Sequence, residues 1–268
     1  MASLTIFSIA TGRYLDFWTR MVTSGIEMID ESIDVDWILM TDKPLEIPKE
    51  IHQKLGGRLQ AVQIAHERWP FPTLKRYKYL VSASQSINSD YLMHLDADMV
   101  FVGPVKDADL DLPLIENDIA CVLHPGFYRP SGLKLAKFYL ANYKVMLSDI
   151  LLLLQFGNIG TWETNKNSSA FVHRSQRKSY VCGGCWFGRT TKILEMASSL
   201  AQNIEFDFEN DFIAKFHDES HLNSFVAANK VQLLPPEFCF EPNYPQLKGL
   251  TAKIIAVDKN ADTEWLRQ

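Results

Sequence analysis

The first part of the chain alternates between short apolar runs and segments whose apolar residues have helical spacing. Leu4 to Ala10 predicts a buried strand, and the apolar residues after the turn at Thr11-Gly12-Arg13 recur every three or four positions, as in a helix. Trp37 to Met40 predicts a second strand, which ends before the proline at position 44. Strand, helix and strand in this order open a βαβ unit and predict an α/β protein.

The same alternation continues toward the middle of the chain. A helix is expected to start near Pro72, with Thr73 as its cap, and to lead into a buried strand at Tyr91 to Leu95. Ile119 to Leu123 predicts a further strand.

The next fifty residues depart from this pattern. Residues from about 131 to 160 combine helical apolar spacing with a run of leucines, which favours an added helical hairpin. Residues 161–179 are polar and basic, which predicts a mobile loop. Because no Gly/Ser-rich linker divides the chain, residues 1–268 are expected to form one catalytic domain. Its nucleotide-binding half would run to about residue 120 and its second half would follow.

Composition narrows the class of protein. A chain of 268 residues with 47% hydrophobic residues can bury a substantial core. The net charge of −5 lacks the basic excess of proteins that mainly bind nucleic acid or anionic membranes, so no nucleic-acid partner is expected. The N-terminus has no cationic leader, and no apolar run reaches the roughly 20 residues of a membrane span. These features predict a soluble, cytoplasmic protein without a transmembrane segment.

Asp96-Ala97-Asp98 is the strongest chemical signal, because it closes the apolar run from Tyr91 to Leu95. Two carboxylates at the end of a buried strand can hold a hard divalent cation, whose coordination a nucleotide diphosphate would complete. The alternative is a turn in which one Asp caps the next element.

His217-Asp218-Glu219-Ser220-His221 packs four ionisable residues into five positions, before an apolar helical pattern. It fits an acid-rich helix start, or a site in which Glu219 stabilises or attacks an oxocarbenium-like centre. The two histidines also suggest a zinc hydrolase, but Asp218 stands where that motif requires Glu.

A second cluster lies at Cys182-Gly183-Gly184-Cys185, which begins a glycine-rich stretch ending at Gly188. Its glycines favour close approach of the backbone to a ligand, or a tight turn before a helix near Thr191. Since no second cysteine pair exists, free thiols are favoured over zinc.

Two further segments carry candidate binding residues. Trp69 precedes Lys75 and Arg76, which could place an aromatic face and two cations near a nucleotide; the alternative is a core tryptophan beside a solvated basic face. Lys259 and Arg267 lie in a polar tail, residues 258–268, that would otherwise be expected to fray.

Taken in order, six segments resemble glycosyltransferase family 6, the family of the ABO blood-group transferases and the α1,3-galactosyltransferase. They are Ile9 to Tyr14, Trp69 to Arg76, Tyr91 to Asp98, His124 to Tyr128, Cys182 to Gly184 and Phe216 to Asn223. The resemblance covers most of the chain. It implies a GT-A fold, a UDP-sugar donor, usually Mn²⁺ or otherwise Mg²⁺, and transfer with retention of configuration, commonly as an α1,3 linkage to a galactoside acceptor.

The resemblance also implies roles for single residues. Asp96 and Asp98 would bind the metal and the diphosphate, Arg76 would lie near the donor sugar, and Glu219 would be the nucleophile or ion-pair stabiliser. The remaining donor-binding residues would be Ile9, Ala10, Tyr14, Cys182, Gly183, Gly184, Asp218, Lys259 and Arg267. The acceptor would contact Trp69, His124, Glu241 and Glu219.

Departures from the family pattern refine the expectation. Some bacterial relatives carry Asn-x-Asn and need no metal, so the intact Asp96 and Asp98 predict metal dependence. The small side chain of Cys182 leaves room for an N-acetyl group, which favours UDP-GalNAc over UDP-Gal. Glu241 stands where an acceptor-binding Asp is usual, and Thr164-Asn165 replace paired arginines. Like bacterial members of the family, the chain is without the anchor and stem of the Golgi enzymes, which suggests a microbial or viral enzyme. The alternatives are a non-catalytic sugar- or nucleotide-binding protein of this fold and, less favoured, a zinc hydrolase.

Overall fold

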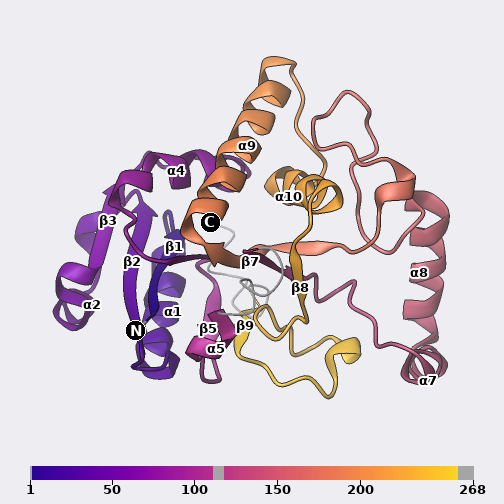
Figure 1. The fold of residues 1–268 in the computed structure, drawn as a ribbon, viewed down its shortest axis with the longest axis horizontal. Coiled ribbons are helices and arrows are strands. Elements are labelled where there is room, and N and C mark those ends of the chain that lie inside the picture. The colour runs from indigo at the N-terminus through magenta and orange to yellow at the C-terminus, as the bar shows by residue number, and fades with distance from the viewer. Residues whose placement is uncertain (1, 111–117, 259–268) are drawn as a thin grey trace.

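The computed structural model describes residues 2–110 and 118–258. Its centre is a seven-stranded mixed sheet with strand order β3-β2-β1-β4-β7-β6-β8 (Figure 1). The strands in this order are β3 (Leu59–Gln63), β2 (Ile33–Thr41), β1 (Ala2–Ile9), β4 (Tyr91–Leu95), β7 (Val181–Arg189), β6 (Ile119–Leu123) and β8 (Gln232–Leu234).

Strand direction determines where a ligand can bind. β1 pairs in parallel with β2 and β4, and β2 pairs in parallel with β3, so these four strands end at one edge of the sheet. β7 runs antiparallel to β4, with Cys185 opposite Leu95, so β7 begins at that same edge. The chain builds β2 and β3 on one side of β1 and then crosses to β4 on the other. This reversal of strand order is the place where α/β sheets bind ligands.

Helices cover both faces of the sheet. α1 (Tyr14–Met28) and α2 (Lys49–Leu55) pack on one face, where Trp18 and Met21 join a core with Leu4, Ile6 and Leu39. The opposite face is covered by α4 (Arg76–Ser82), α9 (Thr190–Glu209) and α10 (His217–Ala228), whose apolar residues pack against the other side of the same strands. Alternate residues of each central strand therefore face different cores.

The smaller elements complete the fold. A two-stranded sheet pairs β5 (Met99–Phe101) with β9 (Ile254–Ala256), and two short helices are α3 (Phe71–Leu74) and α5 (Asp107–Leu110). A helical hairpin of α7 (Leu133–Ala141) and α8 (Tyr143–Phe156) lies at the end of the molecule opposite α2 (Figure 1). No helix in the described part of the chain is long and apolar enough to cross a membrane.

Most elements expected from the apolar pattern are confirmed: the α/β class, the four expected strands (β1, β2, β4 and β6), the helix after Gly12 and the helices in residues 131–160. β3 was not predicted. The mixed α/β architecture with helices on both faces agrees with a GT-A fold.

Two local expectations are wrong. Thr73 does not cap a helix, because it lies inside α3 and its hydroxyl donates to the carbonyl of Pro70; the following helix starts afresh at Arg76. The stretch from Cys182 to Gly188 is not a tight turn but most of β7. Gly188 is required there because a Cβ would lie 2.1 Å from the carbonyl oxygen of Asp118 on the neighbouring chain segment.

Candidate functional site

A cavity of about 860 Å³ opens at the edge where β1, β2, β3 and β4 end. Its lining comes from the segments that follow these strands and from α3 and α4. The lining residues are Ile9, Thr11, Gly12, Arg13, Tyr14, Asp42, Lys43, His66, Glu67, Arg68, Trp69, Pro72, Thr73, Arg76, Asp96, Ala97 and Asp98. Of the predicted donor-binding residues, Ile9, Tyr14, Asp96 and Asp98 line this cavity, whereas Ala10 is fully buried in the core beneath it.

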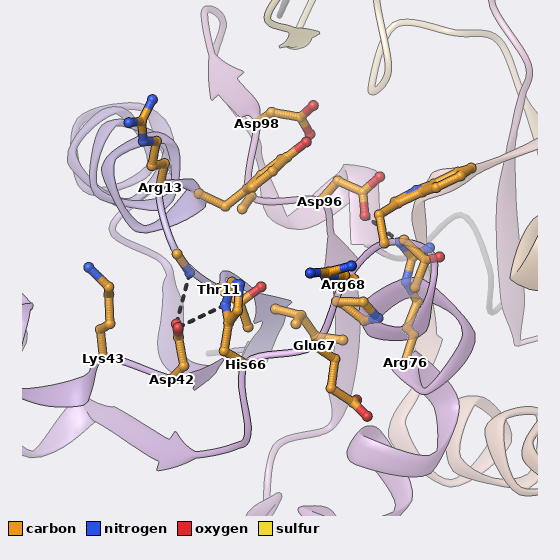
Figure 2. Close-up of a pocket in the computed structure, with 17 residues that line it drawn as sticks. Thr11, Arg13, Asp42, Lys43, His66, Glu67, Arg68, Arg76, Asp96 and Asp98 are labelled. Atoms are coloured by element: carbon orange, nitrogen blue, oxygen red, sulfur yellow. Dashed lines mark hydrogen bonds and ion pairs between the residues drawn. The ribbon is translucent and has the colours of Figure 1, made fainter. Parts of the chain in front are cut away.

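One side of the cavity is organised by Asp42, which follows β2. Its carboxylate accepts a hydrogen bond from the backbone N–H of Gly12 at 2.8 Å and lies 3.0 Å from Nδ1 of His66 (Figure 2). Asp42 thus ties together the segments after β1, β2 and β3. Neither Asp42 nor His66 was expected in the site. Asp42 follows the strand predicted at Trp37 to Met40, whereas the strand before His66 was not predicted.

On the other side lies the acidic turn after β4. The carbonyl of Asp96 accepts from the N–H of Met99 at 3.2 Å, and the carbonyl of Asp98 accepts from the N–H of Val257 at 2.9 Å. Asp98 is 5% exposed. Asp96-Ala97-Asp98 thus forms a turn, and that turn brings both Asp96 and Asp98 to the same cavity. A turn and a cation site at these residues are therefore compatible.

Arg76 joins this turn to the first turn of α10. Its Nη2 lies 2.6 Å from Oδ1 of Asp96, and its Nη1 lies 2.7 Å from Oδ2 of Asp218 and 2.6 Å from the carbonyl oxygen of Gly183. Burial disfavours the charged guanidinium, but Asp218 and Asp96 outweigh it and raise the pKa of Arg76. The charged Arg76 is therefore held between the acidic turn after β4 and the first turn of α10.

Glu219 sits next to this arginine, on α10. Its Oε2 accepts the backbone N–H of Gly183 at 2.9 Å, and the phenol of Tyr180 contacts it as well. Burial raises the pKa of Glu219 to about 7 and that of Asp218 also to about 7, against the favourable charge of Arg76. Because three carboxyl groups share one guanidinium, the cluster retains a proton near neutral pH until another cation binds.

Local sequence explains why α10 carries these groups to β7. The side-chain amide of Asn223 donates to the carbonyl of Val181 at 2.9 Å and accepts its N–H at 2.8 Å, which clamps the helix to the start of the strand. The hydroxyl of Ser220 accepts the N–H of Phe216 at 3.0 Å, which ties the residue before the helix to its first turn. The two alternatives for residues 217–221 are thus compatible, because the acid-rich start of α10 is also where Asp218 and Glu219 meet Arg76 and Gly183.

Gly183 and Gly184 of β7 face different parts of the site. A Cβ on Gly183 would lie 3.4 Å from Arg76, Asp218 and Glu219, and one on Gly184 would lie 3.0 Å from Oδ2 of Asp96. Cys182 is buried beside Cys239 in the core, and all four cysteines are free thiols.

His94 is a site residue that sequence reasoning missed. It is fully enclosed in β4, stacks on Trp186 with ring centroids 4.8 Å apart, and places Nε2 3.2 Å from Oδ1 of Asp96. Burial lowers the pKa of His94 to about 4, so the neutral ring orients Asp96 by a hydrogen bond. The sequence could have indicated His94, because it is a histidine inside an apolar run and lies two residues before Asp96.

Two of the predicted acceptor residues, Trp69 and His124, each contact a ring close to Glu219. Trp69 is exposed at the cavity rim and meets His217 edge-on, with centroids 4.7 Å apart. His124 packs against Tyr180 at 5.9 Å, and Tyr180 in turn reaches Glu219.

Glu241 lies in the segment that leads to Gln246. The side-chain amide of Gln246 donates to the carbonyl of Pro125 at 2.8 Å, next to His124. Lys259 and Arg267 lie outside the described residues.

The arrangement fits a divalent cation held jointly with a ligand. Among residues 2–110 and 118–258, no group of three or more His, Cys, Asp or Glu side chains is placed to hold a metal ion. Two carboxylates completed by diphosphate oxygens are nevertheless a usual way to bind Mg²⁺, and Mn²⁺ takes the same ligands. Asp96 and Asp98 would supply the protein's share.

The zinc-hydrolase hypothesis gains no support from the histidines. The ring of His217 contacts Trp69, whereas Nε2 of His221 lies 3.6 Å from Asp207 on α9. The two rings are thus engaged with different elements of the structure.

Comparison with known proteins points to one family. The sequence model of glycosyltransferase family 6 matches residues 157–268. Globoside alpha-1,3-N-acetylgalactosaminyltransferase 1 of Mus musculus is 25% identical over 98% of this chain and 67% of its own length. O-antigen biosynthesis glycosyltransferase WbnI of Escherichia coli is 23% identical over 97% of this chain and 96% of its own. Histo-blood group ABO system transferase 1 of Rattus norvegicus is 24% identical over 96% of this chain and 66% of its own.

Proposed function

We propose that this chain is a member of glycosyltransferase family 6, on its likeness to that family. In this proposal it is a retaining, metal-dependent enzyme that transfers GalNAc, or otherwise Gal, from a UDP-sugar to a galactoside or related glycan. The linkage formed would be α, and α1,3 is favoured. Glycosyltransferase activity follows from the family; the donor, the mechanism, the metal and the roles of single residues are parts of the proposal.

One observation carries the proposal: Arg76 bridges the acidic turn at Asp96 and the helix start that bears Glu219. A donor in the cavity would place its uridine near Ile9 and Tyr14 and its diphosphate near Asp96 and Asp98. The sugar would then lie beyond Arg76, next to Glu219. The small space left by Gly183 and Gly184 lets it approach the backbone of β7.

The residues have separate roles in the reaction. The bond between the anomeric carbon and the diphosphate oxygen breaks, and its electron pair stays on UDP. A bound Mn²⁺ or Mg²⁺ would supply charge stabilisation for this leaving group. Arg76 adds a fixed positive charge beside it, and Glu219 stabilises the positive anomeric carbon or attacks it. The acceptor hydroxyl forms the new bond to the anomeric carbon and gives its proton to the departing phosphate oxygen of UDP, with Trp69 and His124 flanking its approach.

Release of UDP tests the proposal directly. We expect Mn²⁺-dependent UDP release from UDP-GalNAc, faster than from UDP-Gal, UDP-Glc or UDP-GlcNAc, and faster still when a galactoside is added. Absence of turnover with every donor, including slow hydrolysis, would refute the proposed activity. Calorimetry on the same protein then separates the alternatives, because sugar binding without UDP affinity is what a non-catalytic binding protein would show.

A further inference from the structure

The α7–α8 hairpin exposes an unusual amount of apolar surface. Leu140 is 86% exposed, Leu151 65% and Leu154 70%, and Leu147 is also exposed. Leu147, Leu151 and Leu154 recur at the spacing that puts residues on one face of a helix. Scattered exposed leucines are ordinary, but a continuous stripe of this kind marks a binding surface.

The charge around this stripe has one sign. Between Ile119 and Leu194 the only acidic residues are Asp149 and Glu163, and both are buried. The hairpin itself carries Lys134, Lys137 and Lys144, all exposed. The net charge of −5 for the whole chain therefore hides a local basic surface. The expectation of no anionic membrane partner rested on the net charge of the whole chain, which does not show this local excess of lysine.

The hairpin is firmly joined to the rest of the protein. Asp149 is 2% exposed and forms a bidentate ion pair with Arg129, with both N–O distances 2.6 Å. The hydroxyl of Tyr139 donates to the same carboxylate at 2.8 Å. Arg129 also donates to the carbonyl of Gly126 at 2.9 Å. The hairpin is thus rigidly connected to the loop that begins at His124.

We propose that the α7–α8 hairpin binds the surface of an anionic lipid bilayer, with its leucines in the acyl boundary and its lysines at the headgroups. Leucines are exposed on α8 and lysines on both helices, and residues 119–194 expose no acid. This pair of helices can therefore offer apolar side chains to the acyl boundary and positive charge to anionic headgroups. Each lysine adds attraction to anionic headgroups. This surface is separate from the proposed transfer site, and lipid binding does not rest on that function.

A second copy of the chain is the main competing occupant, and the charges disfavour it. A two-fold interface brings the same patch of both copies together. Lys134, Lys137 and Lys144 would then approach their own copies with no exposed carboxylate nearby to compensate. Lysine is also depleted in the cores of protein interfaces.

Vesicle co-sedimentation of the full chain tests the proposal. We expect binding to vesicles of phosphatidylcholine with phosphatidylglycerol, at least about 10-fold stronger than to phosphatidylcholine alone. Replacing Leu147, Leu151 and Leu154 together by Gln should lower partitioning on the order of 100-fold. Replacing the three hairpin lysines by Gln should weaken binding only to the anionic vesicles. Glutamine keeps helix propensity, so folding should be preserved, as circular dichroism can verify.

Controls make each outcome decisive. Leu45 is 98% exposed and lies outside the hairpin, so Leu45→Gln should bind vesicles as the unchanged protein does. Failure of the unchanged protein to bind anionic vesicles would overturn the proposal. If that protein also sedimented as a dimer which the triple leucine variant dissociated, a second copy would be the occupant. UDP binding, measured in parallel, reports on the transfer site separately.

Discussion

Asp98 and Glu219 lie at opposite ends of the proposed donor position, so substituting them should have different effects. Asp98→Asn removes a metal ligand and should chiefly destroy binding of metal and donor. Glu219→Gln keeps the size of the side chain and should leave UDP binding intact while lowering kcat by several orders of magnitude. Both quantities can be measured by calorimetry with UDP and Mn²⁺ and by UDP release at saturating donor.

A control for this comparison comes from an acidic residue outside the site. Asp118 belongs to the described surface near β6, and Asp118→Asn should change neither UDP affinity nor kcat. Near-normal turnover of Glu219→Gln would show that our role for Glu219 is wrong.

The environment of Glu219 also predicts a pH dependence. Burial raises the pKa of Glu219 to about 7, so its ionised fraction grows as pH rises through that value. Because only the carboxylate can offset positive charge on the sugar, turnover should fall as the pH drops below about 7. A bound cation favours the ionised form, so the midpoint with metal should lie at or below that value.

This dependence is checked by measuring kcat against pH at saturating donor and Mn²⁺. Metal binding must be followed at each pH, so that a loss of metal is not mistaken for protonation of Glu219. A flat profile through this range, with metal bound throughout, would contradict the role given to Glu219.

At the level of elements, β7 brings the two halves of the site together. A Cβ on Gly184 would lie 2.8 Å from Cε of Met99 and 3.0 Å from Oδ2 of Asp96. Gly184→Ala should therefore displace Asp96 and weaken Mn²⁺ binding by about 10- to 100-fold. Titration of UDP release with Mn²⁺ measures the effect.

Gly183→Ala is the matched control, because a Cβ there meets Arg76 and Glu219 at 3.4 Å and not Asp96. It should alter use of the donor sugar more than affinity for Mn²⁺. If Gly184→Ala released UDP with the same dependence on Mn²⁺ as the unchanged protein, the space beside Gly184 would not be needed to position Asp96.

For the whole molecule, metal and donor should bind as one linked event. The protein supplies two carboxylates and the diphosphate would supply further ligands, so UDP and Mn²⁺ should each strengthen binding of the other. At a hundredfold excess over Kd, binding adds about 2.7 kcal/mol of stability. In a protein of this size that is a rise in Tm of roughly 5–10 °C.

Thermal unfolding can test this linkage. UDP and Mn²⁺ added together should raise Tm by this amount. UDP in EDTA, or Mn²⁺ alone, should raise Tm much less. Asp98→Asn should lose the joint effect. An equal rise with UDP in EDTA would place this protein with metal-independent relatives.

The sequence by itself determined the local elements and the likeness to glycosyltransferase family 6. Periodic apolar residues predicted β1, α1, β4 and the hairpin, because burial of one face depends on spacing alone. Motif order identified the site segments, including Asp96 to Asp98 and His217 to His221. It left a tight turn open as an alternative at β7, because three glycines close together are typical of turns. Only the structure shows that the backbone of Asp118 and Ile119 excludes a side chain at Gly188.

Only the tertiary structure decided which distant residues meet. Arg76 contacts Asp96, Gly183 and Asp218 because β4 and β7 are antiparallel neighbours and α10 is clamped to β7. Asp42 joined the site for the same reason, since strand order cannot be read from the spacing of residues within each strand. His94 differs, because it lies only two residues before Asp96. The exposed leucines of α8 also emerged only here, because an apolar run looks the same in sequence whether the fold buries it or leaves it uncovered.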